Sequence, residues 1–350
     1  MACGATFVKI LRISQRFPLV CTIFARVFAH KMETNTHYYI YTGLDSFLRS
    51  HFDGKVQKLS VNAGTTCPNR DGTLGRGGCT YCNNRTFNPD YCAETASVRG
   101  QLEEGKRFFD RKYPQMKYLA YFQAYTNTYG EVAQLRRMYE EALAVEGVVG
   151  LVVGTRPDCV TSEWLDYFER LSRETFVWIE YGIESVYDRT LQRVNRGHDF
   201  AATRWAVEET AGRGIPVGGH LILGLPGETL TDMVAEADVL SSLPLDTLKL
   251  HQLQIIRGTR MAREFAETPG EFRLMTLDDY ISLVSAFLQR LRPGIAVERF
   301  VSQSPASLLI APAWGIKNYE FVDRLKKKMR AEGVCQGMLC DFPEERIETL

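Results

Sequence analysis

Three cysteines in one glycine-rich segment are the residues of this chain best suited to hold an inorganic centre. Cys67, Cys79 and Cys82 lie in TTCPNRDGTLGRGGCTYCNN with the spacing Cys-x11-Cys-x2-Cys. Three thiolates on a four-iron cluster leave one iron open to a further ligand, whereas a structural zinc site takes four protein ligands. Cys92, ten residues after Cys82, is a candidate fourth thiolate. The spacing alone therefore leaves both kinds of site open.

Glycines between the first two cysteines suit a loop that wraps closely around such a centre. Gly72, Gly75, Gly77 and Gly78 permit tight turns and can direct backbone N–H groups at sulfide. The loop directly follows the strand-like run 58–64. In a parallel α/β barrel, loops that follow strands lie at the carboxyl-end mouth, where such folds keep their chemistry. We therefore expect the cysteines at a barrel mouth.

Polar residues also follow the next strand-like runs. Gln123, Asn127 and Thr128 come at the end of one run, where they either bind a ligand or form a polar loop that caps a helix. Arg156, in GTRPD, can pair with a carboxylate or phosphate of a ligand. The structural alternative for Arg156 is a salt bridge with Asp158 or with a neighbouring loop.

Two glutamates bracket a glycine in the apolar run 176–183 and just after it. Glu180 and Glu184 are separated by Gly182 at a period of two, so both point to the same face of a strand. The apolar surroundings favour an inward face over a solvated one. Buried carboxylates need partners, and ribose hydroxyls or Arg156 are suitable.

The segment GLPGET, residues 224–229, has glycines where a strand passes into a helix. Gly224 and Gly227 allow a backbone to approach a ligand closely, although any strand-to-helix turn uses such residues. His220 and His251 fall on strand-like runs. Each is either a hydrogen-bonded core residue or a residue that faces substrate.

Strand-like runs alternate with amphipathic segments from residue 57 onward, which predicts repeated βα units. Six units with short connections favour a partial (β/α)6 barrel of the TIM type, with an open doubly wound sheet as the alternative. The strand-like runs cover residues 58–64, 118–124, 148–154, 176–183, 217–225 and 248–256.

The regular alternation of strand-like and amphipathic segments ends at about residue 268. A helix pattern from Leu277 to Leu291 and a strand-like run at 296–301 predict an α/β extension, residues 269–350, packed on a core of residues 37–268. Near the end, five basic residues surround an apolar face formed by Val322, Leu325 and Met329. They form either a solvated helix face or a surface for RNA phosphates. These basic residues are Arg324, Lys326, Lys327, Lys328 and Arg330.

Composition limits the class of protein. The 42 basic and 42 acidic residues give no net charge, which argues against a dedicated nucleic-acid binder but permits a local basic patch. The nine cysteines cluster only around positions 67–92, which does not resemble a disulfide framework and predicts reduced thiols in a cytoplasmic compartment. No run is long and apolar enough for a membrane helix, so we expect no membrane association.

The first 36 residues differ from the rest of the chain. They carry basic residues without an acid before Glu33, around the short apolar run FPLVCTIFA. An unstructured extension is the favoured interpretation, with Met32 as a possible true start. Export or import into an organelle are the alternatives, because the pattern also resembles a targeting peptide.

Taken together, these motifs resemble those of radical S-adenosylmethionine (radical SAM) enzymes of the YhcC-like family. The resemblance runs from about residue 38 to the end, through FQAYTNTYG, GTRPDCV, IEYGIESVYDRTLQRVNRGHDF, HLILGLPGET, LKLHQLQIIRGTRMA and LLIAPAWGIKN. The wide first gap departs from the common Cys-x3-Cys-x2-Cys of the superfamily but matches this branch. The chain is also distantly similar to the radical SAM domain of the elongator complex catalytic subunit.

The resemblance implies an enzyme with a 4Fe-4S cluster on Cys67, Cys79 and Cys82, which leaves Cys92 as an incidental thiol. The open iron would bind S-adenosylmethionine and cleave it reductively to a 5′-deoxyadenosyl radical, with electrons from a donor such as flavodoxin or ferredoxin. Gln123 and Asn127 would lie near the methionine amino group, and GLPGET would back the adenine.

The resemblance to the elongator subunit implies an RNA substrate, tRNA first. Two alternatives stay open. One is a radical SAM enzyme that acts on a small metabolite or peptide, and the other is a zinc-stapled binding protein without catalysis.

Overall fold

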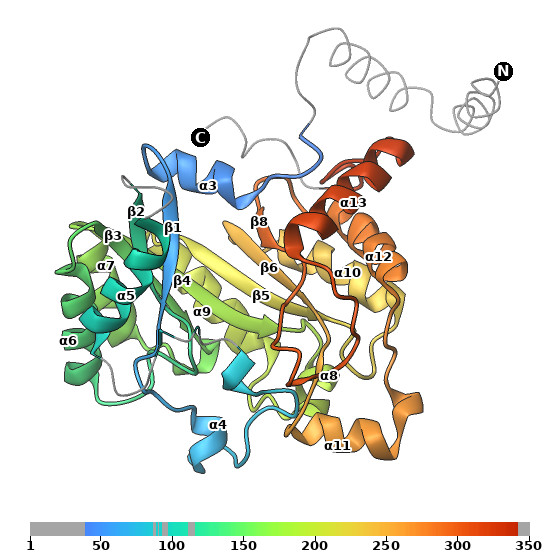
Figure 1. Ribbon diagram of the computed structural model, residues 1–350, viewed down its shortest axis with the longest axis horizontal. Coiled ribbons are helices and arrows are strands. Elements are labelled where there is room, and N and C mark those ends of the chain that lie inside the picture. The colour runs from blue at the N-terminus through green and yellow to red at the C-terminus, as the bar shows by residue number, and fades with distance from the viewer. Residues whose placement is uncertain (1–38, 87–88, 90, 93–96, 111–115, 342–350) are drawn as a thin grey trace, which may run out of the picture. The chain divides into compact units, whose positions relative to one another are not determined.

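The structure, a computed structural model, describes residues 39–86, 89, 91–92, 97–110 and 116–341 (Figure 1). The predictions about an N-terminal extension, a targeting peptide and an alternative start fall outside these residues. The described residues from Ile40 onward belong to one compact unit. Among the described helices, none is long and apolar enough to cross a bilayer.

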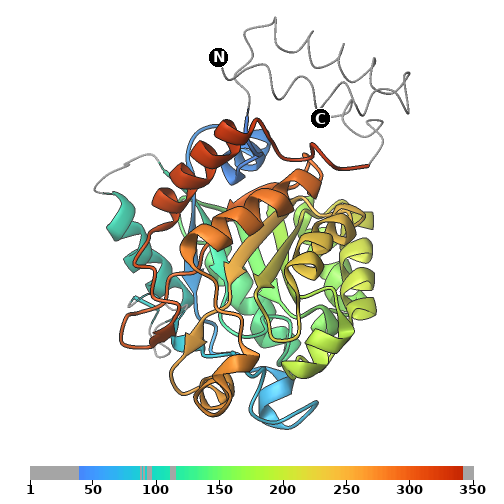
Figure 2. The same cartoon turned by 90° about the vertical axis from the view of Figure 1, so that its right-hand side faces the viewer.

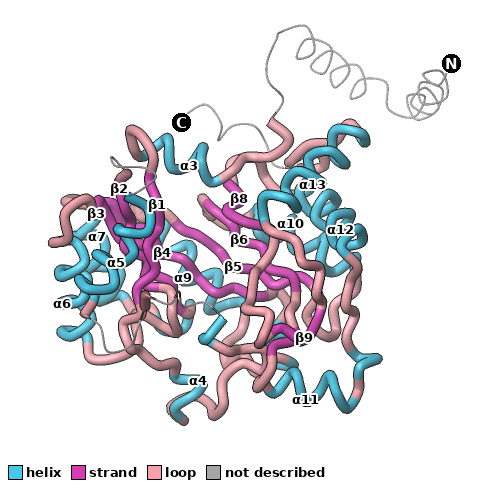
Figure 3. Tube along the Cα trace, in the orientation of Figure 1, coloured by secondary structure: helices cyan, strands magenta, loops and turns pink. Residues whose placement is uncertain are grey.

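A curled sheet of parallel strands forms the centre of this unit, with the strand order β1-β2-β3-β4-β5-β6-β8 (Figure 3). The predicted partial barrel is therefore confirmed. The strand-like run predicted at 296–301 joins this sheet as β8, next to β6, so the described sheet has seven strands rather than six. The strands are β1 (Val56–Val61), β2 (Lys117–Phe122), β3 (Val148–Thr155), β4 (Phe176–Glu184), β5 (Val217–Leu223), β6 (Thr247–Gln252) and β8 (Ala296–Arg299).

Helices cover the outer face of the curled sheet, as Figures 1 and 2 show from two directions. Their apolar faces and the outward-facing strand residues form the main hydrophobic core. The covering helices are α5 (Val98–Asp110), α6 (Val132–Leu143), α7 (Ser162–Ser172), α9 (Phe200–Gly212), α10 (Leu230–Ser241) and α12 (Leu277–Arg290).

Strand β4 shows how the sequence sorts its side chains between the two faces of the sheet. Val177, Ile179 and Tyr181 belong to the outer core, and the residues that alternate with them face inward. Going along the strand, the inward face changes from Trp178 to Glu180. The interior of the partial barrel is thus apolar near the amino ends of the strands and polar toward their carboxyl ends.

Helix α3 (Leu44–His51) covers the apolar end of the barrel interior. Phe47 packs against Trp178 with ring centroids 5.0 Å apart, in a cluster that includes Leu119 and Val152. Aromatic packing of this kind excludes water from that end. Among the described residues, α3 thus closes the apolar end of the interior, and the polar end lies at the carboxyl ends of the strands.

The C-terminal part of the described chain packs on the same unit. Helix α13 (Asn318–Glu332) buries Phe321, Leu325 and Met329 and lies against α12. Two of its basic residues form ion pairs within the helix, Lys327 with Asp323 at 2.8 Å and Lys328 with Glu332 at 2.7 Å. This arrangement supports a solvated helix face for the basic residues of α13.

Two short strands and two short helices complete the mouth of the barrel. β7 (Ile255–Ile256) pairs with β9 (Leu309–Ala311) in antiparallel fashion. The helices α4 (Pro68–Asp71) and α11 (Arg260–Glu267) lie at the end of the unit where the strands terminate, as Figure 1 shows. The candidate site lies between these elements.

Candidate active site

The three-cysteine loop follows β1 and closes over the barrel mouth. Cys67 precedes α4, and the helix ends at Gly72, whose φ of 101° requires a residue without a side chain. Cys67 and Cys79 are buried and Cys82 is half-buried. All three line one cavity of about 190 Å³, so the loop brings together the three thiols that the sequence singled out.

Polar donors are directed at the sulfurs of two of these cysteines. Cys79 Sγ lies 3.6 Å from Arg196 Nη1 and 3.7 Å from Asn69 Nδ2. Cys67 Sγ lies 3.8 Å from Arg156 Nη1. These donors hold the two sulfurs in place at the cavity, as suits cysteines that serve as metal ligands.

Cys82 Sγ has no such donor among the hydrogen bonds of the described residues, where its contact is Asn84 Oδ1 at 3.8 Å. Burial, followed by the neighbouring Cys79 and Cys67, raises the pKa of the Cys82 thiol to about 12. Crowded thiolates of this kind are stabilised when they coordinate a positively charged centre. The donor set is therefore chemically suited to an iron–sulfur cluster.

The spacing of the ligands distinguishes a cluster from one metal ion. No three Cys, His, Asp or Glu side chains in the described ranges converge on a position for a single ion. In a 4Fe-4S cluster each thiolate binds a different iron, so its cysteines stand farther apart than the ligands of one zinc. Tyr81 Oη and Arg196 Nε are buried at the same cavity without a partner among the described residues. The residues present thus fit a cluster.

Cys92, the candidate fourth zinc ligand, lies elsewhere. Its thiol contacts the carbonyl oxygen of Ser60, near the carboxyl end of β1, at 3.0 Å. It does not belong to the residues that line the cavity of the three cysteines. This position agrees with the interpretation of Cys92 as an incidental thiol.

A buried carboxylate lies deeper in the same cavity. Glu180 is 1% exposed, and its two oxygens contact Lys58 Nζ at 2.6 Å, Lys249 Nζ at 3.1 Å and His220 Nε2 at 2.8 Å. Burial acts to raise the pKa of Glu180, but Lys249 and Lys58 hold it well below its usual range. Glu180 is therefore ionised inside the barrel.

A second carboxylate balances the two lysines. Glu298, on β8, contacts Lys58 Nζ at 2.5 Å and Lys249 Nζ at 3.2 Å. Burial and Lys249 lower the pKa of His220, so His220 is neutral at physiological pH. Two lysines and two glutamates thus form a closed, charge-balanced group beneath the cavity. Gly218 makes room for it, because a Cβ there would lie 2.9 Å from Trp178 Nε1 and 3.0 Å from Glu180 Cγ.

Another wall of the cavity consists of uncharged polar side chains. His251 Nδ1 forms a hydrogen bond with Ser302 Oγ, and burial lowers the pKa of His251 well below its usual value. Gln254 Nε2 donates to Ser302 O at 3.2 Å, and Ser304 Oγ donates to Gln254 Oε1 at 2.7 Å. This wall can exchange hydrogen bonds with a polar ligand without adding charge.

Four of the seven residues expected to bind a cofactor line the cavity of the cysteines. They are Gln123, Arg156, Glu180 and Glu184. Arg156 also pairs with Asp158 through two hydrogen bonds of 2.9 and 2.8 Å, which is its structural alternative. Glu180 has lysine and histidine partners instead of Arg156. The cofactor-binding roles of these residues stay predictions.

The other three residues do not belong to the lining of this cavity. Asn127 is buried and donates to Phe122 O at 2.9 Å and to Gly154 O at 2.8 Å, so its amide ties the end of β2 to the end of β3. Gly224 has a φ of 102°, and Gly227 has a φ of 94°. Both glycines serve the turn between β5 and α10, and their proximity to a cofactor stays a prediction.

Sequence reasoning missed Arg196 and the lysines. Arg196 bridges the loop and β4, because its Nη2 donates to Gly182 O at 2.6 Å while Nη1 faces Cys79. The segment NRGH around Arg196 was a weak signal, since a polar segment between two helices is common. Lys58 and Lys249 gave no sequence signal, because an isolated lysine in a strand usually faces solvent.

Comparisons with known proteins agree with this geometry. The model of the Radical SAM superfamily matches residues 61–240, and that of the Radical_SAM C-terminal domain matches residues 245–331. Protein YhcC of Escherichia coli is 37% identical over 297 residues, which cover 85% of this chain and 94% of YhcC. The chain therefore belongs to the radical SAM superfamily and, within it, to the YhcC-like family. It is a radical SAM enzyme, and this superfamily uses a 4Fe-4S cluster and S-adenosylmethionine.

More distant relatives share part of the chain. The tRNA uridine(34) acetyltransferase of Methanocaldococcus infernus is 24% identical over 196 residues, 55% of this chain and 35% of that protein. The structure of the Elp3 protein of that archaeon, with an N-terminal deletion, matches with a TM-score of 0.61 at 18% identity. The match covers 81% of this chain and 65% of that one, and it shows a shared fold. The predicted distant similarity to the elongator subunit is confirmed.

Proposed function

We propose that this radical SAM enzyme modifies an RNA, tRNA in the first place, at a cluster held by Cys67, Cys79 and Cys82. The observation that carries the site assignment is the single cavity that all three thiols line, with Arg196 and Arg156 directed at two of the sulfurs. A cluster bound there would, with S-adenosylmethionine, supply radical chemistry that removes a hydrogen atom from the substrate.

The surrounding residues hold and orient the reactants. Arg196 stabilises the negative charge of Cys79 and ties the loop to Gly182. Gln123 and Glu184 are assigned to S-adenosylmethionine because they offer polar atoms to the same cavity. The apolar end closed by α3 keeps water from entering behind the reactants. This is the contribution that a protein makes when a cofactor performs the reaction.

The choice of tRNA is supported by the relative named as a tRNA uridine(34) acetyltransferase. The similarity covers 35% of that protein, so the proposal concerns a tRNA substrate and not the acetyl transfer. Reduced cysteines and the oxygen sensitivity of such a cluster favour a cytoplasmic location. An electron donor such as flavodoxin or ferredoxin would reduce the cluster.

Two experiments test the proposal. The reconstituted protein should carry iron and sulfide and, with dithionite, release 5′-deoxyadenosine from S-adenosylmethionine. A colourless protein with one zinc on four thiols would refute the cluster assignment. For the substrate, nucleosides from tRNA of a deletion strain are compared by mass spectrometry with those of the complemented strain. An unchanged nucleoside profile would favour the metabolite or peptide alternative.

A further inference from the structure

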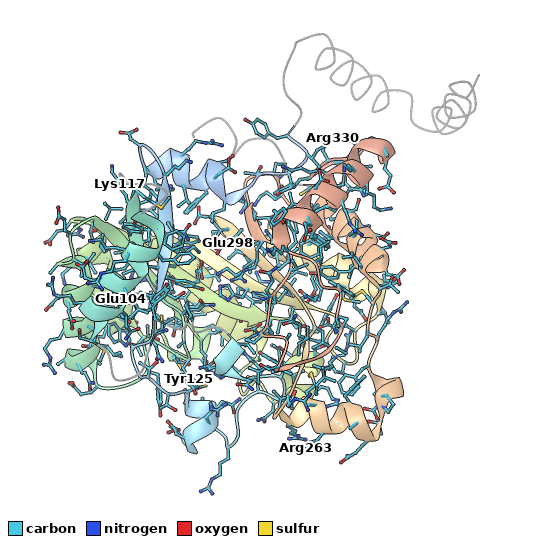
Figure 4. The ribbon with its side chains drawn as sticks, viewed as in Figure 1. Glu104, Lys117, Tyr125, Arg263, Glu298 and Arg330 are labelled. Atoms are coloured by element: carbon cyan, nitrogen blue, oxygen red, sulfur yellow. The ribbon has the colours of Figure 1, made fainter. Side chains whose placement is uncertain are left out.

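A second hollow opens beside the cavity of the cysteines. It encloses about 460 Å³ between the cysteine loop and helix α11. Cys79, Cys82 and Tyr125 line both hollows, so the two hollows are neighbours on either side of these residues. Figure 4 shows Tyr125 and Arg263 at the same end of the unit, where the strands of the sheet terminate.

Four arginines are the charged residues that line this hollow, which we call the arginine groove. Arg70 and Arg76 come from the cysteine loop, and Arg260 and Arg263 come from α11. No aspartate or glutamate belongs to the described residues that line the groove. A chain without net charge thus concentrates positive charge beside its candidate active site.

Most of these guanidinium groups have no carboxylate partner in the described part of the chain. Arg70, Arg76 and Arg263 are exposed, and none of them forms an ion pair with another residue of the described ranges. Only Arg260 has a carboxylate partner, Glu264 at 2.8 Å. Guanidinium groups bind phosphate oxygens through paired N–H donors, so unpaired arginines on both sides of a groove are suited to phosphates.

Tyr125 adds an aromatic surface between the groove and the cavity. The ring is half-buried and lies 5.6 Å from the guanidinium carbon of Arg70. Its backbone has a φ of 59°, which is a strained conformation for a tyrosine. Such strain occurs at ligand-binding sites, and nucleobases stack on exposed aromatic rings in RNA-binding proteins.

We propose that the arginine groove binds the sugar–phosphate backbone of a single-stranded RNA segment, so that the nucleotide next to it passes Tyr125 into the cavity. The inference rests on the proposed function and identifies the surface by which its substrate is held. Four arginines spread along a hollow of about 460 Å³ match several phosphates in succession better than the single phosphate of a metabolite. Base pairing would keep the target nucleotide stacked, so an unpaired loop is the part of a tRNA that fits.

Binding of labelled tRNA transcript to the holoenzyme, followed by fluorescence anisotropy at several salt concentrations, tests the groove. The double variant Arg76→Gln/Arg263→Gln should bind tRNA roughly tenfold more weakly for each arginine lost. The magnitude of its slope of log affinity against log salt should decrease by about two, one for each arginine. The variant Arg76→Lys/Arg263→Lys should keep the slope because it keeps the charges. The visible absorbance of the cluster reports whether each variant is folded.

The matched control is Arg324→Gln/Arg330→Gln, which removes two exposed arginines from α13. Figure 4 shows Arg330 at the opposite end of the unit from Arg263. This control should bind as the wild type does. An equal loss of tRNA affinity in both double variants would overturn the proposed role of the arginine groove, since binding would then follow the overall charge of the protein.

Competition with uridine monophosphate separates RNA from a small phosphorylated metabolite. The mononucleotide should displace tRNA only at concentrations far above those at which unlabelled tRNA does. Equal competition would overturn the assignment to an RNA backbone. The wild type could bind and modify tRNA while the groove variant keeps its affinity and salt slope. In that case the arginine groove does not bind the RNA, and the proposed function stands. If the wild type binds no tRNA, both are wrong.

Discussion

Arg196 lies with one guanidinium nitrogen 3.6 Å from Cys79 Sγ and another 2.6 Å from the carbonyl oxygen of Gly182. The residue thus connects a candidate cluster ligand to β4, the strand that carries Glu180 and Glu184. Reduction adds negative charge to a cluster, so a buried positive charge beside its ligand stabilises the reduced state.

Replacement of Arg196 by glutamine should make the cluster harder to reduce. We expect a more negative reduction potential and about 10–100-fold slower release of 5′-deoxyadenosine, the usual cost of losing a group that supports a metal ligand. Redox titration followed by electron paramagnetic resonance measures the potential. Arg196→Lys should recover part of the shift, and Arg204→Gln, an exposed position on α9, should leave it unchanged. Equal potentials in all three variants would refute the role of Arg196.

The cysteines of the loop and Cys92 should behave differently. Cys79→Ala removes a proposed ligand, so the protein should lose most of its iron and sulfide and its visible absorbance. Cys92→Ala removes a thiol that contacts only Ser60 O among the hydrogen bonds described, and its iron content should match the wild type. Iron and sulfide analysis after anaerobic reconstitution makes the comparison. A Cys92 variant as poor in iron as the Cys79 variant would restore the four-thiolate alternative.

Glu180 should be critical for stability. Its loss leaves the buried charges of Lys58 and Lys249 with one carboxylate instead of two. Breaking such a buried group by removing one partner costs about 3–5 kcal/mol. Urea unfolding of Glu180→Gln should show this loss, whereas Glu208→Gln, on the exposed face of α9, should change stability by less than about 0.5 kcal/mol. Similar midpoints for the two variants would contradict the prediction.

A buried pair of glutamates should make stability depend on pH. Glu236 accepts a hydrogen bond from Val186 N at 3.0 Å, and Glu228 accepts one from Ser185 Oγ at 2.6 Å. Burial, and then the neighbouring Glu228, raises the pKa of Glu236 well above its ordinary value of 4.5. The folded state therefore keeps a proton that the unfolded chain releases.

The contribution of this pair to the free energy of unfolding is fully present below the ordinary pKa of a glutamate. It is lost as the pH rises toward the raised pKa of Glu236 in the folded protein. Glu236→Gln removes the ionisable group. Between about pH 5 and pH 8 the wild type should lose stability relative to this variant, by about 1.4 kcal/mol for each unit of pKa shift. Urea midpoints across this range measure the difference. Parallel pH profiles would show that Glu236 does not contribute.

Local sequence patterns were sufficient to predict the strands and the loop that follows β1. Alternation in β4 and the apolar runs of the other strands determine which face of each strand is buried, and short connections leave few topologies. Three cysteines within sixteen residues meet because one short loop carries them all. Arg196 reaches Cys79 from 117 residues away along the chain, and no local pattern predicts such a contact.

The sequence by itself determined the three-cysteine loop, the place of this loop after the first strand and the membership of the chain in a family of partial barrels. Each of these depends on residues close together along the chain. The tertiary structure decided the rest. It grouped Lys58, Glu180, Lys249 and Glu298 into a charge-balanced interior, and it set the arginines of α11 opposite those of the cysteine loop. These relationships depend on the curl of the sheet, which brings its first strand and its last strand to the same buried group of charges.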